Sequence, residues 1–164
     1  MVTTFGTINM SRIKKLLFCL LIPQAVGLLS YYFIRGNMDY YKVLALPPLA
    51  PPTWVFPLVW TTLFLLMGIA SYLVYMRGRD RTQVRDALKM YAIMLVFTFL
   101  WPLVFFNLRT DLFAFLILLV QWIFTGITAA QFYRTSHAAG YLMLPVWIWV
   151  TFAGYLNLAI WFLN

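Results

Sequence analysis

Charged residues are scarce in this sequence, and glutamate is missing altogether. Four Asp are the only acidic residues, and charged residues of all types make up 10% of the chain. A soluble domain usually carries about 25% charged residues and only about half apolar ones. Here the hydrophobic fraction is 64%. This composition argues against a soluble protein and indicates a single-domain integral membrane protein.

Cysteine and histidine occur once each, as Cys19 and His137. A single cysteine excludes an intramolecular disulfide. The chain offers no cluster of metal ligands, so we expect no metal site and no obligatory cofactor. Haem iron could in principle take either side chain or a methionine. Cys19 lies in an apolar run and His137 in a short connection, which favours a core residue and a loop residue instead.

Five charge-free stretches, each able to hold a membrane-spanning helix of roughly 20 residues, organise the chain. They run over residues 16–34, 43–76, 90–108, 112–133 and 138–164. In lipid every backbone donor has to be satisfied internally, so continuous apolar runs predict helices. We therefore predict an all-α membrane protein, a bundle of five transmembrane helices.

Prolines set the start of the second helix, because Pro47, Pro48, Pro51 and Pro52 cannot lie in a helix interior. The loop 35–52 is then the only long one, and short connections at 109–111 and 134–137 make the last three helices antiparallel neighbours. A basic segment, 1–15, precedes one transmembrane domain, 16–164. The predicted spans are about 13–34, 53–76, 90–108, 112–133 and 139–161.

Basic residues are distributed unequally between the two ends of these spans. One side holds Arg134, the basic residues of the amino-terminal segment and those of the connection 77–89, whereas the other holds only Arg35, Lys42 and Arg109. In a bacterial plasma membrane this asymmetry predicts a cytoplasmic amino terminus. The excess charge suits a membrane surface, and without a basic soluble face we expect no nucleic-acid binding.

The amino-terminal segment lacks a cleavable signal, so the first apolar stretch is predicted to remain in the protein. Translation could begin at Met1 or at Met10.

No Asp, Glu, Lys or Arg lies within the five charge-free stretches, which argues against a proton-coupled antiporter and against acid–base catalysis.

Aromatic residues, 20% of the chain, are the remaining signal. Trp54, Trp122 and Trp161 fit an interfacial belt or helix packing. Trp101 and Trp149 fall near the middle of their spans, and Trp60 nearly two turns inside its own, where each indole N–H needs a partner. Helical spacing puts each on a shared face, namely Met94–Thr98–Trp101–Phe105, Trp60–Phe64–Gly68–Ser71 and Pro145–Trp149–Phe152–Leu156. These faces predict either a pocket for a flat apolar ligand or plain core packing.

Several motifs resemble those of the TspO/translocator-protein family. The stretch 46–60, LPPLAPPTWVFPLVW, followed by MGIASY at 67–72, is similar to its signature around the second helix. WPLVFF at 101–106 resembles its third-helix motif, LPVWIWVTFA at 144–153 with Leu156-Asn157 its fifth-helix motif, and Pro23 and Gly27 its first.

This resemblance implies a cavity beneath the first loop that binds porphyrin or haem, with control of tetrapyrrole levels or stress responses downstream. Light-dependent porphyrin breakdown is implied at Trp60 and Trp149, which leaves enzymatic activity open. The implied ligand-binding residues are Leu49, Trp60, Phe64, Thr98, Trp101, Phe105, Val146, Trp149, Ala153 and Leu156.

Departures from the family pattern bear on ligand choice, because Leu49, Phe64, Thr98 and Val146 replace family residues that include polar ligand contacts. The carboxy-terminal motif for sterols lacks its basic residue, so sterol binding through that motif is not expected. A transporter of tetrapyrroles or other small hydrophobic molecules and a ligand-free membrane subunit remain alternatives. Gly126 and Ala130 form a small-residue pair that allows close helix contact, either within the chain or in a homodimer.

Overall fold

The computed structural model describes residues 10–78 and 80–164. Within them lie five long helices, α1 (Met10–Ile34), α3 (Val55–Arg77), α4 (Arg81–Pro102), α5 (Asp111–Thr135) and α6 (His137–Leu163). A π-helix, η1 (Leu103–Leu108), continues α4, and a short helix, α2 (Tyr40–Val43), lies in the first loop. Each of the five helical segments is long and apolar enough to span a membrane, which confirms the predicted all-α, five-helix architecture.

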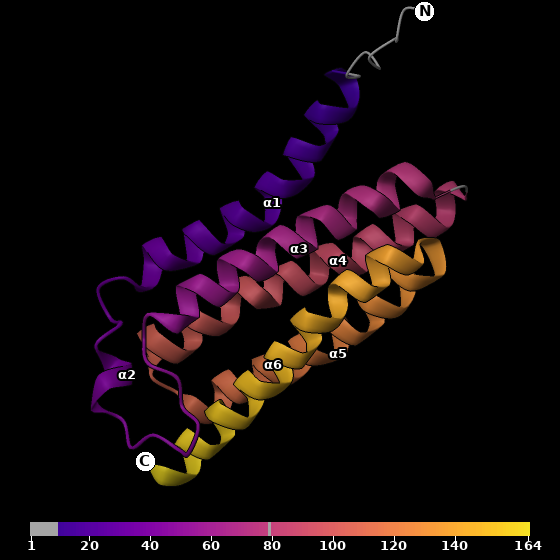
Figure 1. Cartoon of the computed structure of the whole chain (residues 1–164). Coiled ribbons are helices and arrows are strands. Elements are labelled where there is room, and N and C mark those ends of the chain that lie inside the picture. The colour runs from indigo at the N-terminus through magenta and orange to yellow at the C-terminus, as the bar shows by residue number, and fades with distance from the viewer. Residues whose placement is uncertain (1–9, 79) are drawn as a thin grey trace, which may run out of the picture.

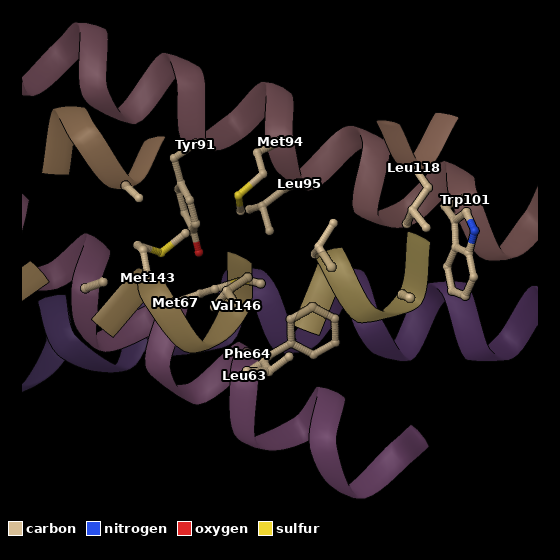
Figure 2. Close-up of a cluster of buried hydrophobic side chains, with 14 of the residues drawn as sticks. Leu63, Phe64, Met67, Tyr91, Met94, Leu95, Trp101, Leu118, Met143 and Val146 are labelled. Atoms are coloured by element: carbon tan, nitrogen blue, oxygen red, sulfur yellow. The ribbon is translucent and has the colours of Figure 1, made fainter. Parts of the chain in front are cut away.

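The five long helices form a ring whose order differs from their order along the chain (Figure 1). Helix α1 packs on α3, α3 on α6, α6 on α5, α5 on α4, and α4 packs back on α1. Met67, Met94, Phe132 and Met143 are fully buried within this ring. Figure 2 shows how side chains from several helices, including Met67, Met94, Met143 and Val146, meet in one core.

Helix α4 begins nine residues before the predicted span at 90. Asp80 caps it, because its Oδ1 accepts the backbone N–H groups of Thr82 at 2.8 Å and Gln83 at 3.3 Å. The apolar pattern therefore located the membrane-embedded part and not the start of the helix. Helix α1 likewise begins at Met10, so part of the predicted basic segment is helical, whereas residues 1–9 and Arg79 lie outside the described residues.

The last three long helices are joined by very short connections, as predicted. Arg109 and Thr110 separate η1 from α5, and Ser136 alone separates α5 from α6. His137 was predicted as a loop residue, but it is the first residue of α6, and its ring stacks on Tyr133 with centroids 4.5 Å apart.

Helices α1 and α3 approach closely because glycine occupies two contact positions. A Cβ on Gly68 would lie 2.7 Å from the Leu20 Cα, and one on Gly27 would collide with the Phe64 ring. Pro23 lies inside α1, where it removes a backbone donor and favours a kink. The amino-terminal turns of α1 accordingly diverge from α3, whereas the rest of the helix follows it (Figure 1).

The first loop, residues 35–54, covers one end of the bundle and is tied to the helices below it. Tyr155 on α6 donates its hydroxyl to the Pro48 carbonyl at 3.0 Å. The Asn164 side chain pairs with the Ala45 backbone, accepting its N–H at 2.9 Å and donating to its carbonyl at 3.1 Å. These bonds hold the loop against the carboxy-terminal end of α6.

Candidate functional site

Aromatic side chains converge beneath the first loop, where α3 and α6 face each other. The Phe56 ring on α3 contacts Tyr41 of α2 edge-on, at 5.3 Å between centroids, and Trp149 of α6, at 6.2 Å. Trp149 also contacts Phe152, one turn further along α6, at 5.5 Å. We call the cluster of Tyr41, Phe56, Trp149 and Phe152 the loop-side aromatic cluster.

The predicted face of α4 is buried along its whole length. Met94, Thr98, Trp101 and Phe105 are all at most 9% exposed, and the rings of Trp101 and Phe105 stack at 5.8 Å. The buried indole N–H of Trp101 is hydrogen-bonded, as expected, because it donates to Asn157 Oδ1 at 2.9 Å. This bond joins α4 to α6 across the interior of the ring.

Thr98 is bonded to a residue that sequence reasoning missed. Its hydroxyl donates to the Met94 carbonyl at 2.9 Å and accepts from Gln121 Nε2 of α5 at 3.0 Å. Gln121 is 1% exposed, and its Oε1 has no hydrogen-bond partner. An uncharged amide inside the apolar run 112–133 was a visible signal, because polar side chains within membrane helices face the bundle interior.

The predicted face of α3 packs largely on α1. Phe64 is 6% exposed and lies against Gly27, while Gly68 lies against Leu20. Trp60 is half-buried, and its ring contacts Phe64 at 5.4 Å. Phe56, one turn before Trp60, provides the ring of α3 that contacts Trp149. On α3 it is therefore Phe56 that contacts Trp149, whereas Trp60 contacts Phe64.

The buried stripe of α6 is rotated by one residue from the predicted face. Its members are Met143, Val146, Val150, Ala153, Asn157 and Ile160, and Leu156 is also buried, whereas Pro145 is exposed. Trp149 lies at the edge of this stripe and is half-buried. Its indole N–H is shielded but has no hydrogen-bond partner, so it is a free donor inside the loop-side aromatic cluster.

Leu49, on the first loop, differs from the other predicted ligand residues, because 82% of its surface is exposed, whereas they are buried or half-buried. Its φ of 69° lies in the left-handed region, which a leucine rarely adopts. The Ala50 N–H donates to the Pro47 carbonyl at 3.2 Å, so Leu49 is the third residue of a β-turn. That position favours glycine when φ is positive.

The remaining tryptophans agree with the belt or packing interpretation. Trp54 and Trp161 are 65% and 40% exposed near helix ends. Trp122 donates its N–H to Thr151 Oγ1 at 2.8 Å, and its ring contacts Trp147 at 5.3 Å. Trp147 also packs over Gly126, so this glycine serves a contact within the chain.

Tyr40 of α2 links the first loop to the bundle. Its hydroxyl donates to the Asp111 carboxylate, 3.1 and 3.2 Å from the two oxygens, and Phe105 contacts its ring at 5.7 Å. Burial, followed by the nearby Asp111 charge, raises the pKa of Tyr40 above its ordinary value. Asn157 Nδ2 donates to the Asp111 carbonyl at 2.8 Å. Loop, α5, α6 and α4 are thus connected through Tyr40, Asp111, Asn157 and Trp101.

Among the described residues there is no group of three or more His, Cys, Asp or Glu side chains that could hold a metal ion. At the loop-side aromatic cluster a ligand could stack on the aromatic rings and accept a hydrogen bond from one free N–H group. On α5, Gln121, which is bonded to Thr98, has one free carbonyl acceptor. Such a site suits a flat, largely apolar molecule with few polar atoms.

Comparison with known proteins gives a consistent result. The TspO/MBR family profile matches residues 19–162. The Tryptophan-rich protein TspO of Chlorobaculum tepidum is 35% identical over 154 residues, which cover 93% of this chain and 98% of that protein. The Tryptophan-rich sensory protein of Cereibacter sphaeroides is 38% identical over 119 residues, 73% of each chain. The Translocator protein of Ovis aries is 34% identical over 143 residues, 86% of this chain and 85% of that protein.

Proposed function

This chain belongs to the TspO/MBR family, and from that premise we propose that it binds a porphyrin or haem inside the membrane, beneath its first loop. The observation that carries this proposal is Trp149, whose buried N–H lacks a partner while Phe56 and Phe152 contact its ring. A buried N–H without an acceptor lowers the stability of the protein, and a polar atom of a flat ligand stacked among these rings would supply the missing acceptor.

The ligand would enter between α3 and α6, where it separates Phe56 from Trp149 and lies below the β-turn of Leu49. Trp101 and Phe105 would form the wall on α4, and Thr98 with Gln121 its polar floor. The buried Val146, Ala153 and Leu156 would shape the side on α6, and Trp60 and Phe64 the side on α3. Because these groups pack against one another in this structure, binding requires the first loop and the rings beneath it to move apart.

Porphyrin binding could serve two further activities, light-dependent breakdown and transport, and each is tested separately. Trp60 and Trp149 are candidates for light-dependent porphyrin breakdown, since an indole ring is easily oxidised. Movement of a tetrapyrrole through the bundle would make the protein a transporter. The relatives carry the words "sensory" and "translocator" in their names, so the names do not separate these roles.

We also propose that the membrane is a bacterial plasma membrane with the amino terminus in the cytoplasm. The two termini of the described chain lie at opposite ends of the bundle, as an odd number of spans requires (Figure 1). Arg77, Arg81, Arg85 and Lys89 lie at the amino-terminal end, where the positive-inside rule puts the cytoplasm. A homodimer would use the outward faces of these helices.

Binding is tested by titrating protoporphyrin IX, and separately haemin, into the full chain in lipid nanodiscs while tryptophan fluorescence is recorded. Saturable quenching with a 1:1 end point supports the proposal. Linear, non-saturating quenching equal to that of empty nanodiscs with free tryptophan would favour a ligand-free membrane subunit. Net flux of the same porphyrin into sealed vesicles would identify a transporter.

A further inference from the structure

A hollow of about 560 Å³ lies on the outside of the bundle at its loop end, away from the loop-side aromatic cluster. Its apolar wall consists of Leu112, Phe113 and Leu116 of α5 together with Trp161 of α6. The polar side chains around it are those of Arg109, Thr110, Asp111 and Asn164. A hollow at the ends of two membrane-spanning helices, lined by apolar residues on one side and polar residues on the other, lies where lipid headgroups meet acyl chains.

The two charged residues of this hollow, Arg109 and Asp111, do not form an ion pair with each other. The ion pairs within 4 Å among the described residues are Lys42–Asp39, Arg85–Asp86 and Lys89–Asp86, and none involves Arg109 or Asp111. The hollow therefore offers one cation and one anion to an outside partner. The Asn164 amide, by contrast, is occupied by the Ala45 backbone.

Tyr40 holds both charges in place. The Arg109 guanidinium lies over its ring, 5.4 Å from the centroid, and its hydroxyl donates to the Asp111 carboxylate. A carboxylate has about four acceptor positions, and the single Tyr40 hydroxyl, shared between the two oxygens, leaves others free. The guanidinium keeps its donors, since a contact with the face of a ring uses none.

We propose that this hollow binds a phospholipid with a phosphoethanolamine headgroup. The guanidinium of Arg109 donates to the lipid phosphate, and the lipid ammonium donates to the Asp111 carboxylate. One acyl chain lies along Leu112, Leu116 and Trp161. The headgroup and the hollow are complementary in charge, because the lipid has a phosphate and an ammonium group where the protein has Arg109 and Asp111.

Other abundant headgroups match this pair less well. A choline group carries positive charge but has no N–H, so it cannot donate to Asp111. A glycerol headgroup has hydroxyl groups but no cation, so it cannot form an ion pair with Asp111. Charge-assisted hydrogen bonds are roughly twice as strong as neutral ones, so the difference in headgroup chemistry is large enough to select a lipid.

The test uses the full chain in nanodiscs that contain equal amounts of ethanolamine, choline and glycerol phospholipids with the same acyl chains. After mild detergent release, native mass spectrometry measures which lipid remains bound. We expect the ethanolamine lipid to be retained about tenfold more than the choline lipid, the factor set by one charge-assisted bond. Equal retention of the three lipids would overturn the proposal.

Two variants with opposite effects assign the selectivity to this hollow. Asp111→Asn keeps an oxygen for the Tyr40 hydroxyl but removes the charge, so the preference for ethanolamine should disappear. Asp111→Glu keeps the charge and should keep the preference. Arg109→Gln should lower retention of phospholipids in general, whereas Arg35→Gln, at the same end of the bundle over Tyr32, should not. A preference that survives Asp111→Asn with an unchanged helical circular dichroism spectrum would place the lipid elsewhere.

Discussion

The indole N–H of Trp101 on α4 donates to the side-chain oxygen of Asn157 on α6, 2.9 Å away in the bundle interior. Helix α5 shares this connection, since the same Asn157 amide donates to the Asp111 carbonyl at 2.8 Å. One side chain therefore joins three helices near the loop end of the bundle. The Asp111 carboxylate extends the connection to Tyr40 on the first loop.

Replacing Asn157 with Leu should destabilise the protein by about 1–3 kcal/mol, because the buried Trp101 N–H loses its acceptor. The free energy of unfolding can be measured by titration with a denaturing detergent. In a double-mutant cycle with Trp101→Phe, the coupling energy should be about 0.6 kcal/mol and at most about 1.7, the range of interhelical bonds in membranes. Zero coupling would mean that the bond adds nothing to stability.

Trp149→Phe should weaken porphyrin binding more than Trp60→Phe does. Both changes keep an aromatic ring, but only Trp149 has a buried N–H free to donate to a ligand. We expect a loss of about fivefold for Trp149→Phe, the equivalent of one hydrogen bond of about 1 kcal/mol. Fluorescence titration measures both variants, with Trp54→Phe and Trp161→Phe as exposed controls. Equal losses at all four positions would refute the placement of the site.

Light-dependent breakdown is measured with the same variants by following porphyrin absorbance under illumination. If Trp60 or Trp149 reacts, its replacement by Phe should abolish breakdown while most of the binding remains, because phenylalanine is far harder to oxidise. Breakdown that continues unchanged in both variants would remove these residues from any such chemistry.

Gln121→Leu should leave stability unchanged or slightly raised, since it removes a buried carbonyl oxygen without a partner. Thr98 would keep its own bond to the Met94 carbonyl. Porphyrin affinity should fall severalfold if this oxygen accepts a donor from the ligand, as the proposed polar floor requires. Thermal denaturation and fluorescence titration of the variant separate the two effects, and unchanged affinity would exclude Gln121 from the site.

Loosening the first loop should raise the rate of ligand release. The Tyr155→Phe change removes the hydroxyl that donates to the Pro48 carbonyl, and Tyr41→Phe the one that donates to the Pro51 carbonyl at 3.1 Å. Replacing Pro51 and Pro52 with Gly adds backbone freedom that binding has to remove again. Stopped-flow displacement of porphyrin measures the release rate. Unchanged rates in all of these variants would make the loop a simple connector.

A tag at the amino terminus should be protected from added protease in intact bacterial spheroplasts, as the basic residues at that end of the bundle predict. Lysis should expose the tag. A tag placed after Asn164 is the matched control, because the opposite end should be cleaved without lysis. The reverse pattern would invert the topology.

The number of helices and their short connections could be predicted because charges and prolines interrupt the apolar stretches. The start of α4 could not, since the cap formed by Asp80 lies in a charged segment that hydropathy assigns to a loop. The face of α6 was displaced by one residue because this helix is apolar on all sides, so its periodicity does not distinguish neighbouring faces. The bond between Gln121 and Thr98 joins residues on different helices, which spacing within one helix cannot reveal.

The ring order also determines how the bundle can be assembled. Helices α4, α5 and α6 contact their neighbours along the chain and can pair as soon as they are inserted. Helix α3, however, packs on α6, which is synthesised last, and α1 packs on α4. A nascent chain that lacks α6 therefore cannot close the ring, and the face of α3 that packs on α6 stays open to lipid until α6 is inserted. We expect chains truncated before His137 to be recognised and degraded as orphan membrane segments.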